Sequence, residues 1–161
     1  MKNKVFNVRV YALVFSREGA ILASDEFRYG HLITKFPGGG LEFGEGLIEC
    51  LQRECMEELG QAVSVKEHFY TTDFFQVSAF DENQQVLSVY YLAEPEEPVI
   101  KKISMQKFDF PEMKEGAQSF RWIMPGKIAP AEFTFPIDKM VASLIRERIS
   151  GGQTFTGKFP M

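Results

Sequence analysis

The sequence has very few cysteines and no long apolar run. Its two cysteines, Cys50 and Cys55, lie five residues apart in one predicted helix. This spacing fits neither a disulfide framework nor a CxxC site, so we predict reduced thiols and a cytoplasmic protein. No apolar stretch approaches the roughly 18 residues of a membrane-spanning helix. A secretory signal peptide is not expected either, because Asn7 and Arg9 interrupt the first apolar residues.

The chain also has no excess of positive charge, since 18 basic and 22 acidic residues give a formal net charge of −4. This balance argues against binding of long nucleic acid through a basic surface. With 161 residues, of which 45% are hydrophobic and 25% charged, the chain predicts one domain with a sizeable core. We place this domain at residues 1–150, followed by a flexible tail at 151–161 that Phe155 or Phe159 would anchor. Sixteen phenylalanines predict aromatic core layers, a stacking pocket or a dimer surface.

The most informative stretch runs from Gly38 to Gln61 and reads GGGLEFGEGLIECLQRECMEELGQ. Three glycines after Pro37 predict a tight turn that lets the backbone approach a ligand closely. A helix is expected from about Glu45, and Gly60 is a good left-handed cap for its end. Seven residues stand at the spacing G-x5-E-x7-R-E-x2-E-E-x-G, namely Gly39, Glu45, Arg53, Glu54, Glu57, Glu58 and Gly60.

Three glutamates of this helix share one face. At about 100° per residue, Glu54, Glu57 and Glu58 fall within about 100° of one another. Such carboxylates repel one another, and a bound cation would turn the repulsion into attraction. Mg²⁺ prefers carboxylate and carbonyl oxygens and keeps places for substrate phosphates. The glycines and the acidic face together predict a cradle for a metal–pyrophosphate complex. The adjoining stripe of Ile48, Leu51, Cys55 and Leu59 is expected to pack on a sheet.

The spacing resembles the Nudix box, the signature of the Nudix hydrolases, and all seven fixed residue types are present. At roughly 7% per residue type, a chance match has odds of about one in 10⁸. The resemblance implies Mg²⁺- or Mn²⁺-dependent hydrolysis of a nucleoside diphosphate linked to another moiety. It implies that the metal ligands are Glu54, Glu57, Glu58 and the carbonyl of Gly38, with Gly39 next to the substrate. Glu54 and Glu57 are the expected catalytic residues, and Glu54 is the first choice for the general base.

Two other charged residues of the motif are expected to be structural. Glu45 would lie in the first helical turn, where its charge suits the helix dipole and its oxygens can accept from loop amides. Arg53 is predicted to face away from the acidic cluster and to brace the loop through Glu45. Two positions depart from the box, because Cys55 and Gln61 replace aliphatic residues. We expect Gln61 to be exposed after the helix end.

Outside the box, a fourth carboxylate and two substrate contacts are predicted. The stretch KEGAQSFRWI resembles the Lys-Glu-Gly loop ahead of a Trp-bearing strand in MutT-type members of the family. That resemblance points to Glu115 as a further metal ligand, with Glu112 as the alternative. Arg28 is a candidate phosphate contact. Tyr29 is a candidate for stacking on a base, with Phe74 and Phe80 as alternatives.

The order of the remaining elements predicts the fold. Strands are expected at 5–15, 20–24 and 32–36, with a polar loop at 25–31. After the box helix, 63–80 is expected to hold one long strand or two short ones, and 85–93 to close a hairpin with it. A solvated connector at 94–118, a strand at 119–124 and a helix at 136–149 follow. The resemblance implies the Nudix α/β/α sandwich around a mixed sheet, an α/β fold.

Three functions remain open on the sequence. The first is a pyrophosphohydrolase of a small-molecule nucleotide, most directly a nucleoside triphosphate. The second is an ADP-ribose or nucleotide-sugar pyrophosphatase, for which a homodimer is the expected assembly. The third is a Nudix-like nucleotide-binding regulator without catalysis. The intact trio of Glu54, Glu57 and Glu58 weighs against the third.

Overall fold

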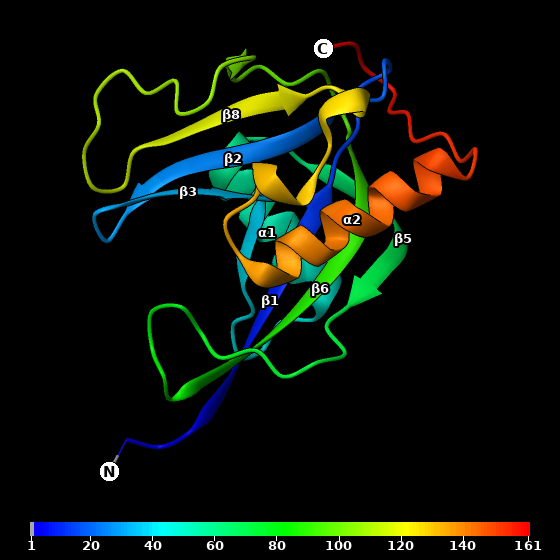
Figure 1. Ribbon diagram of the computed structural model, residues 1–161. Coiled ribbons are helices and arrows are strands. Elements are labelled where there is room, and N and C mark those ends of the chain that lie inside the picture. The colour runs from blue at the N-terminus through cyan, green and yellow to red at the C-terminus, as the bar shows by residue number, and fades with distance from the viewer. Residues whose placement is uncertain (1) are drawn as a thin grey trace. The chain divides into compact units, whose positions relative to one another are not determined.

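The computed structural model describes residues 2–161, which fold into two compact units. The first unit consists of the N-terminal residues through Leu13 together with residues 37–97. The second consists of residues 14–36 and 98–161. Each unit is built on a four-stranded mixed sheet and carries one α-helix (Figure 1). The mixed α/β class predicted from the sequence is therefore confirmed, with the strands divided between two sheets.

The sheet of the first unit has the order β4-β1-β6-β5. Its strands are β1 (Val5–Leu13), β4 (Gly38–Gly40), β5 (Val63–Thr71) and β6 (Gln84–Pro95). β1 and β6 run parallel, whereas β1–β4 and β5–β6 are antiparallel. The predicted hairpin is confirmed as the β5–β6 pair, although its first strand already ends at Thr71. The second half of β1 and the middle of β6 are buried without a break, and there the rings of Tyr11 and Tyr90 stack with centroids 5.2 Å apart.

Helix α1 (Leu47–Leu59) covers this sheet and contacts β1, β4 and β5. Its buried residues are Cys50, Leu51, Cys55 and Leu59. The predicted stripe was wrong at one position, because Ile48 is 49% exposed and Cys50 is buried instead. Gly60 ends the helix with φ 70°, in the left-handed conformation predicted for it.

Gln61 is another correction, since it is buried and not exposed. Its Nε2 donates to the carbonyl oxygen of Glu97 at 2.8 Å. The amide therefore ties the end of α1 to the chain that leaves β6. A buried amide that finds such an acceptor is tolerated where an unpaired one would not be.

The sheet of the second unit has the order β3-β2-β8-β7. Its strands are β2 (Ile21–Arg28), β3 (His31–Lys35), β7 (Ile103–Ser104) and β8 (Gln118–Ile123). Only β7–β8 is parallel, and Figure 1 shows β8 (yellow) lying along β2 (blue). Short 3-10 turns η1 (Pro125–Lys127) and η2 (Pro130–Glu132) lead into α2 (Pro136–Ser150), whose buried face includes Ile137, Val141 and Ile145.

The predicted polar loop at 25–31 was wrong. β2 continues to Arg28 and turns through Tyr29 and Gly30, with φ of 52° and 73°, into β3. Two successive positive φ values are typical of the tight turn that matches the twist of a hairpin. Asp25 and Glu26 can lie buried in a strand because Arg121 and Lys35 pair with them, at 2.7 and 3.1 Å.

The last eleven residues pack against other parts of the second unit. Phe155, one of the two predicted anchors, is buried and stacks on Phe15 with ring centroids 5.0 Å apart. The amide of Gly157 donates to the carbonyl of Ser16 at 2.8 Å. The amide of Arg17 donates to the carbonyl of Phe159 at 2.7 Å. Across residues 2–161, no helix is long and apolar enough to cross a membrane.

Candidate active site

The glycine segment ahead of α1 is an extended strand, not the tight turn predicted. In β4, Gly38 pairs with Tyr11 and Gly39 pairs with Val10 of β1. Gly38 has φ 142°, and a Cβ on it would lie 2.1 Å from the carbonyl oxygen of Val10. A Cβ on Gly39 would lie 2.3 Å from Oε1 of Glu54. The glycines are needed because a strand and a helix side chain approach this backbone closely.

Two of the three box glutamates lie against this strand. Glu58 accepts a hydrogen bond from the amide of Gly38 through Oε2, at 2.9 Å. Glu54 packs its carboxylate against Gly39 and is largely buried. Glu57, one turn along, is 58% exposed. The structure therefore brings together Gly38, Gly39, Glu54 and Glu58, with Glu57 on the solvent side of the same helix.

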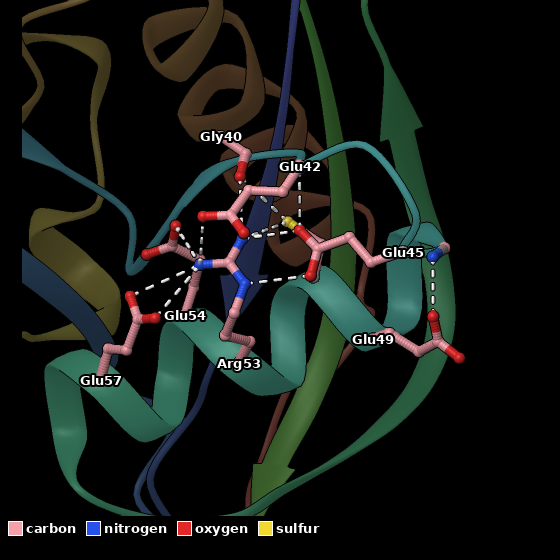
Figure 2. A network of polar contacts seen from close by, with 9 residues as sticks. Gly40, Glu42, Glu45, Glu49, Arg53, Glu54 and Glu57 are labelled. Carbon is pink, nitrogen blue, oxygen red and sulfur yellow. Dashed lines mark hydrogen bonds and ion pairs between the residues drawn. The ribbon is translucent and has the colours of Figure 1, made fainter.

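Arg53 occupies the centre of the polar network (Figure 2). As predicted, it braces the loop, because its Nη2 contacts Oε1 of Glu45 at 2.6 Å and the carbonyl of Gly40 at 3.0 Å. The prediction that it faces away from the acidic cluster was wrong. Its Nη1 also donates to Glu54 at 3.1 Å and to Glu57 at 3.3 Å. A guanidinium has five donors in a fixed plane, so one side chain can serve both sides.

Glu45 holds the loop before the helix. It lies one residue ahead of the N-cap Gly46, not in the first helical turn as predicted, and it accepts from the amide of Glu42 at 2.9 Å. The hydrogen bonds from Arg53, and then the one from Glu42, lower the pKa of Glu45 from 4.5 to about 2. In turn, Glu45 raises the pKa of Arg53. The first-turn acid is instead Glu49, whose Oε2 accepts from the amide of Gly46 at 2.8 Å.

Burial raises the pKa of two further groups of the helix, Glu54 and Cys50. It raises the pKa of Glu54, and the negative charge of Glu58 raises it further. Glu54 and Glu58 thus carry like charges close together, and a nearby cation would reduce the repulsion between them. Burial, and then the hydrogen bond to Glu45, raise the pKa of Cys50 to about 12. Cys50 is therefore a neutral thiol, and it donates to the carbonyl of Gly40 at 3.5 Å. Both cysteines are free.

The donor set fits a hard divalent cation. Carboxylate and carbonyl oxygens are the ligands that Mg²⁺ and Mn²⁺ prefer, and Glu54 and Glu58 stand beside the Gly38 backbone. In residues 2–161, no three acidic, thiol or imidazole side chains converge in ligand geometry. The reason lies in the network, because Arg53 contacts both Glu54 and Glu57, and the Gly38 amide contacts Glu58.

The other predicted site residues belong to the second unit. Arg28 ends β2 and contacts Glu26 at 3.4 Å. Tyr29 is exposed at the hairpin turn, and its amide donates to Oε1 of Glu115 at 2.8 Å. Glu112 forms an ion pair with Lys114 at 3.2 Å. One oxygen of Glu115 thus holds the β2–β3 turn, a role that the sequence did not suggest.

Residues 5–144 match the sequence profile of the NUDIX domain. The chain belongs to the Nudix family. No curated protein sequence matches it. A Nudix protein of this kind is a hydrolase of pyrophosphate bonds and acts on small nucleotide-type substrates, and the family generally uses divalent metal ions.

Solved structures of the same fold are numerous. A NUDIX hydrolase from Nitrosomonas europaea is 20% identical, with a TM-score of 0.60 over 93% of this chain and 92% of that one. A MutT protein from Methanosarcina mazei Go1 is 16% identical, with a TM-score of 0.64 over 92% and 99%. A UDP-X diphosphatase is 13% identical, with a TM-score of 0.58 over 94% and 66%. At these identities the similarity shows the Nudix fold.

Proposed function

We propose that this Nudix hydrolase is a Mg²⁺-dependent pyrophosphohydrolase that cleaves nucleoside triphosphates. The observation that carries the proposal is the packing of the Glu54 carboxylate against Gly39, with Glu58 on the Gly38 amide. This puts two acidic side chains beside one stretch of backbone, so that carboxylate and carbonyl oxygens, the ligands that Mg²⁺ prefers, lie close together. The Lys114-Glu115-Gly116 sequence, like that of MutT-type proteins, favours the triphosphate as substrate.

Each residue of the site then has a role. Glu54, Glu57, Glu58 and the carbonyl of Gly38 hold the metal, and Glu115 is the proposed further ligand. When bound, the metal neutralises phosphate oxygens and lowers the pKa of water. Glu54 accepts a proton from the attacking water, a role suited by its raised pKa. Arg53 and Glu45 fix the loop, and Arg28 and Tyr29 contact phosphate and base.

A nucleotide sugar is the second candidate substrate. One structural neighbour is named a UDP-X diphosphatase, and its reaction class needs the same acidic face. ADP-ribose belongs to this alternative, for which a homodimer is expected. A cytoplasmic location is proposed from the free cysteines.

The test is hydrolysis of a panel containing nucleoside triphosphates, ADP-ribose and nucleotide sugars, with Mg²⁺. We expect nucleoside monophosphate and pyrophosphate from a triphosphate. Glu57→Gln should lower kcat at least about 100-fold, beyond what outer-shell partners of a metal contribute. Glu49→Gln is the matched control, because it lies on the same helix and its amide oxygen can still accept from Gly46.

Three results would each contradict a part of the proposal. Turnover confined to ADP-ribose or nucleotide sugars would select the second candidate. Nucleotide binding without turnover, identical in wild type and Glu57→Gln, would indicate a non-catalytic regulator. Equal activity of Glu57→Gln and Glu49→Gln would contradict the placement of the metal site.

A further inference from the structure

The sheet of the first unit has one open edge, at the beginning of β1. This strand has nine residues, but β4 pairs only with Arg9, Val10 and Tyr11. On the other side, β6 accompanies β1 over its whole length, from Val5 to Leu13. In the part of the chain that the structure describes, no strand pairs with the first half of β1 on the side away from β6. Figure 1 shows this beginning of β1 (dark blue) beside β6 (green).

The backbone groups of Phe6 point to the open side. The amide of Val5 donates to the carbonyl of Asn83, next to β6, at 3.0 Å. The carbonyl of Val8 accepts from the amide of Leu41, on the β4 side, at 2.8 Å. Alternate residues of a strand direct their N–H and C=O groups to opposite neighbours. Phe6, which alternates with Val5 and shares the direction of Val8, therefore presents its N–H and C=O at the open edge.

The other edges of this sheet are closed. Along β4, side chains of α1 bond the outward backbone groups of Gly38 and Gly40. β5, at the opposite edge, has two register shifts in its pairing with β6 and carries the exposed Lys66. Bulges and charged side chains are common ways to prevent pairing at a sheet edge. The beginning of β1 instead exposes two apolar side chains, because Val5 is 49% and Phe6 72% exposed.

We propose that this edge is the interface of a homodimer, in which β1 of a second copy pairs antiparallel with β1 about a two-fold axis at Val5. Leu41 sets the register, because it lies opposite Val8 and stops any pairing there. An axis at Phe6 would put Lys4 of the second copy where Leu41 lies. With the axis at Val5, the N–H and C=O groups of Phe6 meet those of Lys4 of the second copy, and the reverse pair forms by symmetry. The two four-stranded sheets then join into one.

Side chains on both faces fit this register. On one face, Val5 meets Val5 of the second copy in a non-hydrogen-bonded pair, where side chains lie closest in an antiparallel sheet. On the other face, Phe6 lies beside Lys4 of the second copy, whose apolar stem and ammonium group suit an aromatic ring. Beyond this pair, Lys2 of the second copy comes next to Glu42, whose side chain is 71% exposed. Apolar surface and opposite charges therefore meet when the partner is a second copy of this chain.

Sedimentation equilibrium on the full chain tests the dimer, with no nucleotide or metal added. We expect twice the mass of the chain for wild type. Val5→Lys should raise the dissociation constant of the dimer at least about tenfold, because two like charges then lie opposite each other. Val5→Asp should do the same, whereas an equimolar mixture of Val5→Lys and Val5→Asp should dimerise again. Val77→Lys is the matched control, because Val77 is 39% exposed and lies on the side of β6 away from β1.

Two further variants test the backbone pairing and the position of the axis. Phe6→Pro removes the N–H that donates across the interface but none that bonds to β6, so it should weaken the dimer and leave the fold intact. Val5→Cys should form a disulfide-linked dimer on oxidation, because Cα atoms of such a pair are about 4.5 Å apart. Val77→Cys should not form one. The native Cys50 and Cys55 are buried and do not compete.

The possible outcomes separate the dimer from its interface. A wild-type chain that is monomeric at every concentration would overturn the proposal. A dimer that Val5→Lys and Phe6→Pro leave unchanged, or a charge-swapped mixture that stays monomeric, would overturn this interface. Circular dichroism distinguishes dissociation from unfolding, and where a variant unfolds, the cross-linking of Val5→Cys against Val77→Cys decides. None of these measurements uses a nucleotide, so their result is independent of the hydrolysis proposed above.

Discussion

The substitution Gly38→Ala tests how closely the glycine strand is packed. The new Cβ would lie 2.1 Å from the Val10 carbonyl oxygen and 2.8 Å from Cα of Tyr11, whereas ordinary contact begins at 3.4 Å. Both neighbours are backbone atoms of β1, so relief requires the two strands to separate by about 1 Å. The residue would also hold φ 142°, which costs about 1–3 kcal/mol for a side-chain-bearing residue.

Together these effects should lower the free energy of unfolding by about 4 kcal/mol, a size associated with such named distortions. For a domain of this length, that corresponds to a fall in Tm of about 8–16 °C. Thermal unfolding followed by circular dichroism measures it. Gly40→Ala is the control in the same strand, because its Cβ would meet only Arg9 Nη1, at 3.7 Å. If both variants unfold within about 1 kcal/mol of each other, the close packing of β4 on β1 is refuted.

Three other substitutions test particular contacts. Because the pKa of Glu45 falls from 4.5 to about 2 on folding, its charge stabilises the protein above pH 4.5 and the effect is lost as pH falls toward 2. Glu45→Gln should therefore lower Tm at pH 7 but hardly at pH 2.5, and an equal loss at both pH values would contradict this. Glu115→Gln keeps the acceptor for the Tyr29 amide but removes the charge. Tm should therefore stay the same, while the Mg²⁺ concentration for half-maximal activity rises. An unchanged metal titration would show that Glu115 is not a ligand. Phe155→Ala, which empties the stacking position on Phe15, should cost about 3 kcal/mol and expose the tail to proteolysis, and an unchanged cleavage rate would show that the tail is not held there.

The sequence alone determined the elements whose cause is local. The helix ending at Gly60, the helix before Ser150 and the β5–β6 hairpin follow from periodicity, capping and turn residues. The grouping of Glu54, Glu57 and Glu58 follows from helix geometry, and the spacing of seven residues was enough to point to the family.

Tertiary structure decided whatever depends on a partner distant in sequence. The sequence alone predicted a polar loop at Asp25 and Glu26, because the neighbouring residues give no sign of Arg121 or Lys35. These two cations let the carboxylates lie in a buried strand. The three glycines were predicted to form a turn, whereas they form a strand. Their partner strand β1 lies almost thirty residues earlier in the sequence, so local sequence does not indicate the pairing. The sequence predicted that Arg53 points away from the acidic cluster, because a helical wheel gives only the direction of Cβ. The long side chain nevertheless brings the guanidinium to Glu54. Each difference has the same physical origin: a polar or strained group is stable only when the folded chain supplies its partner.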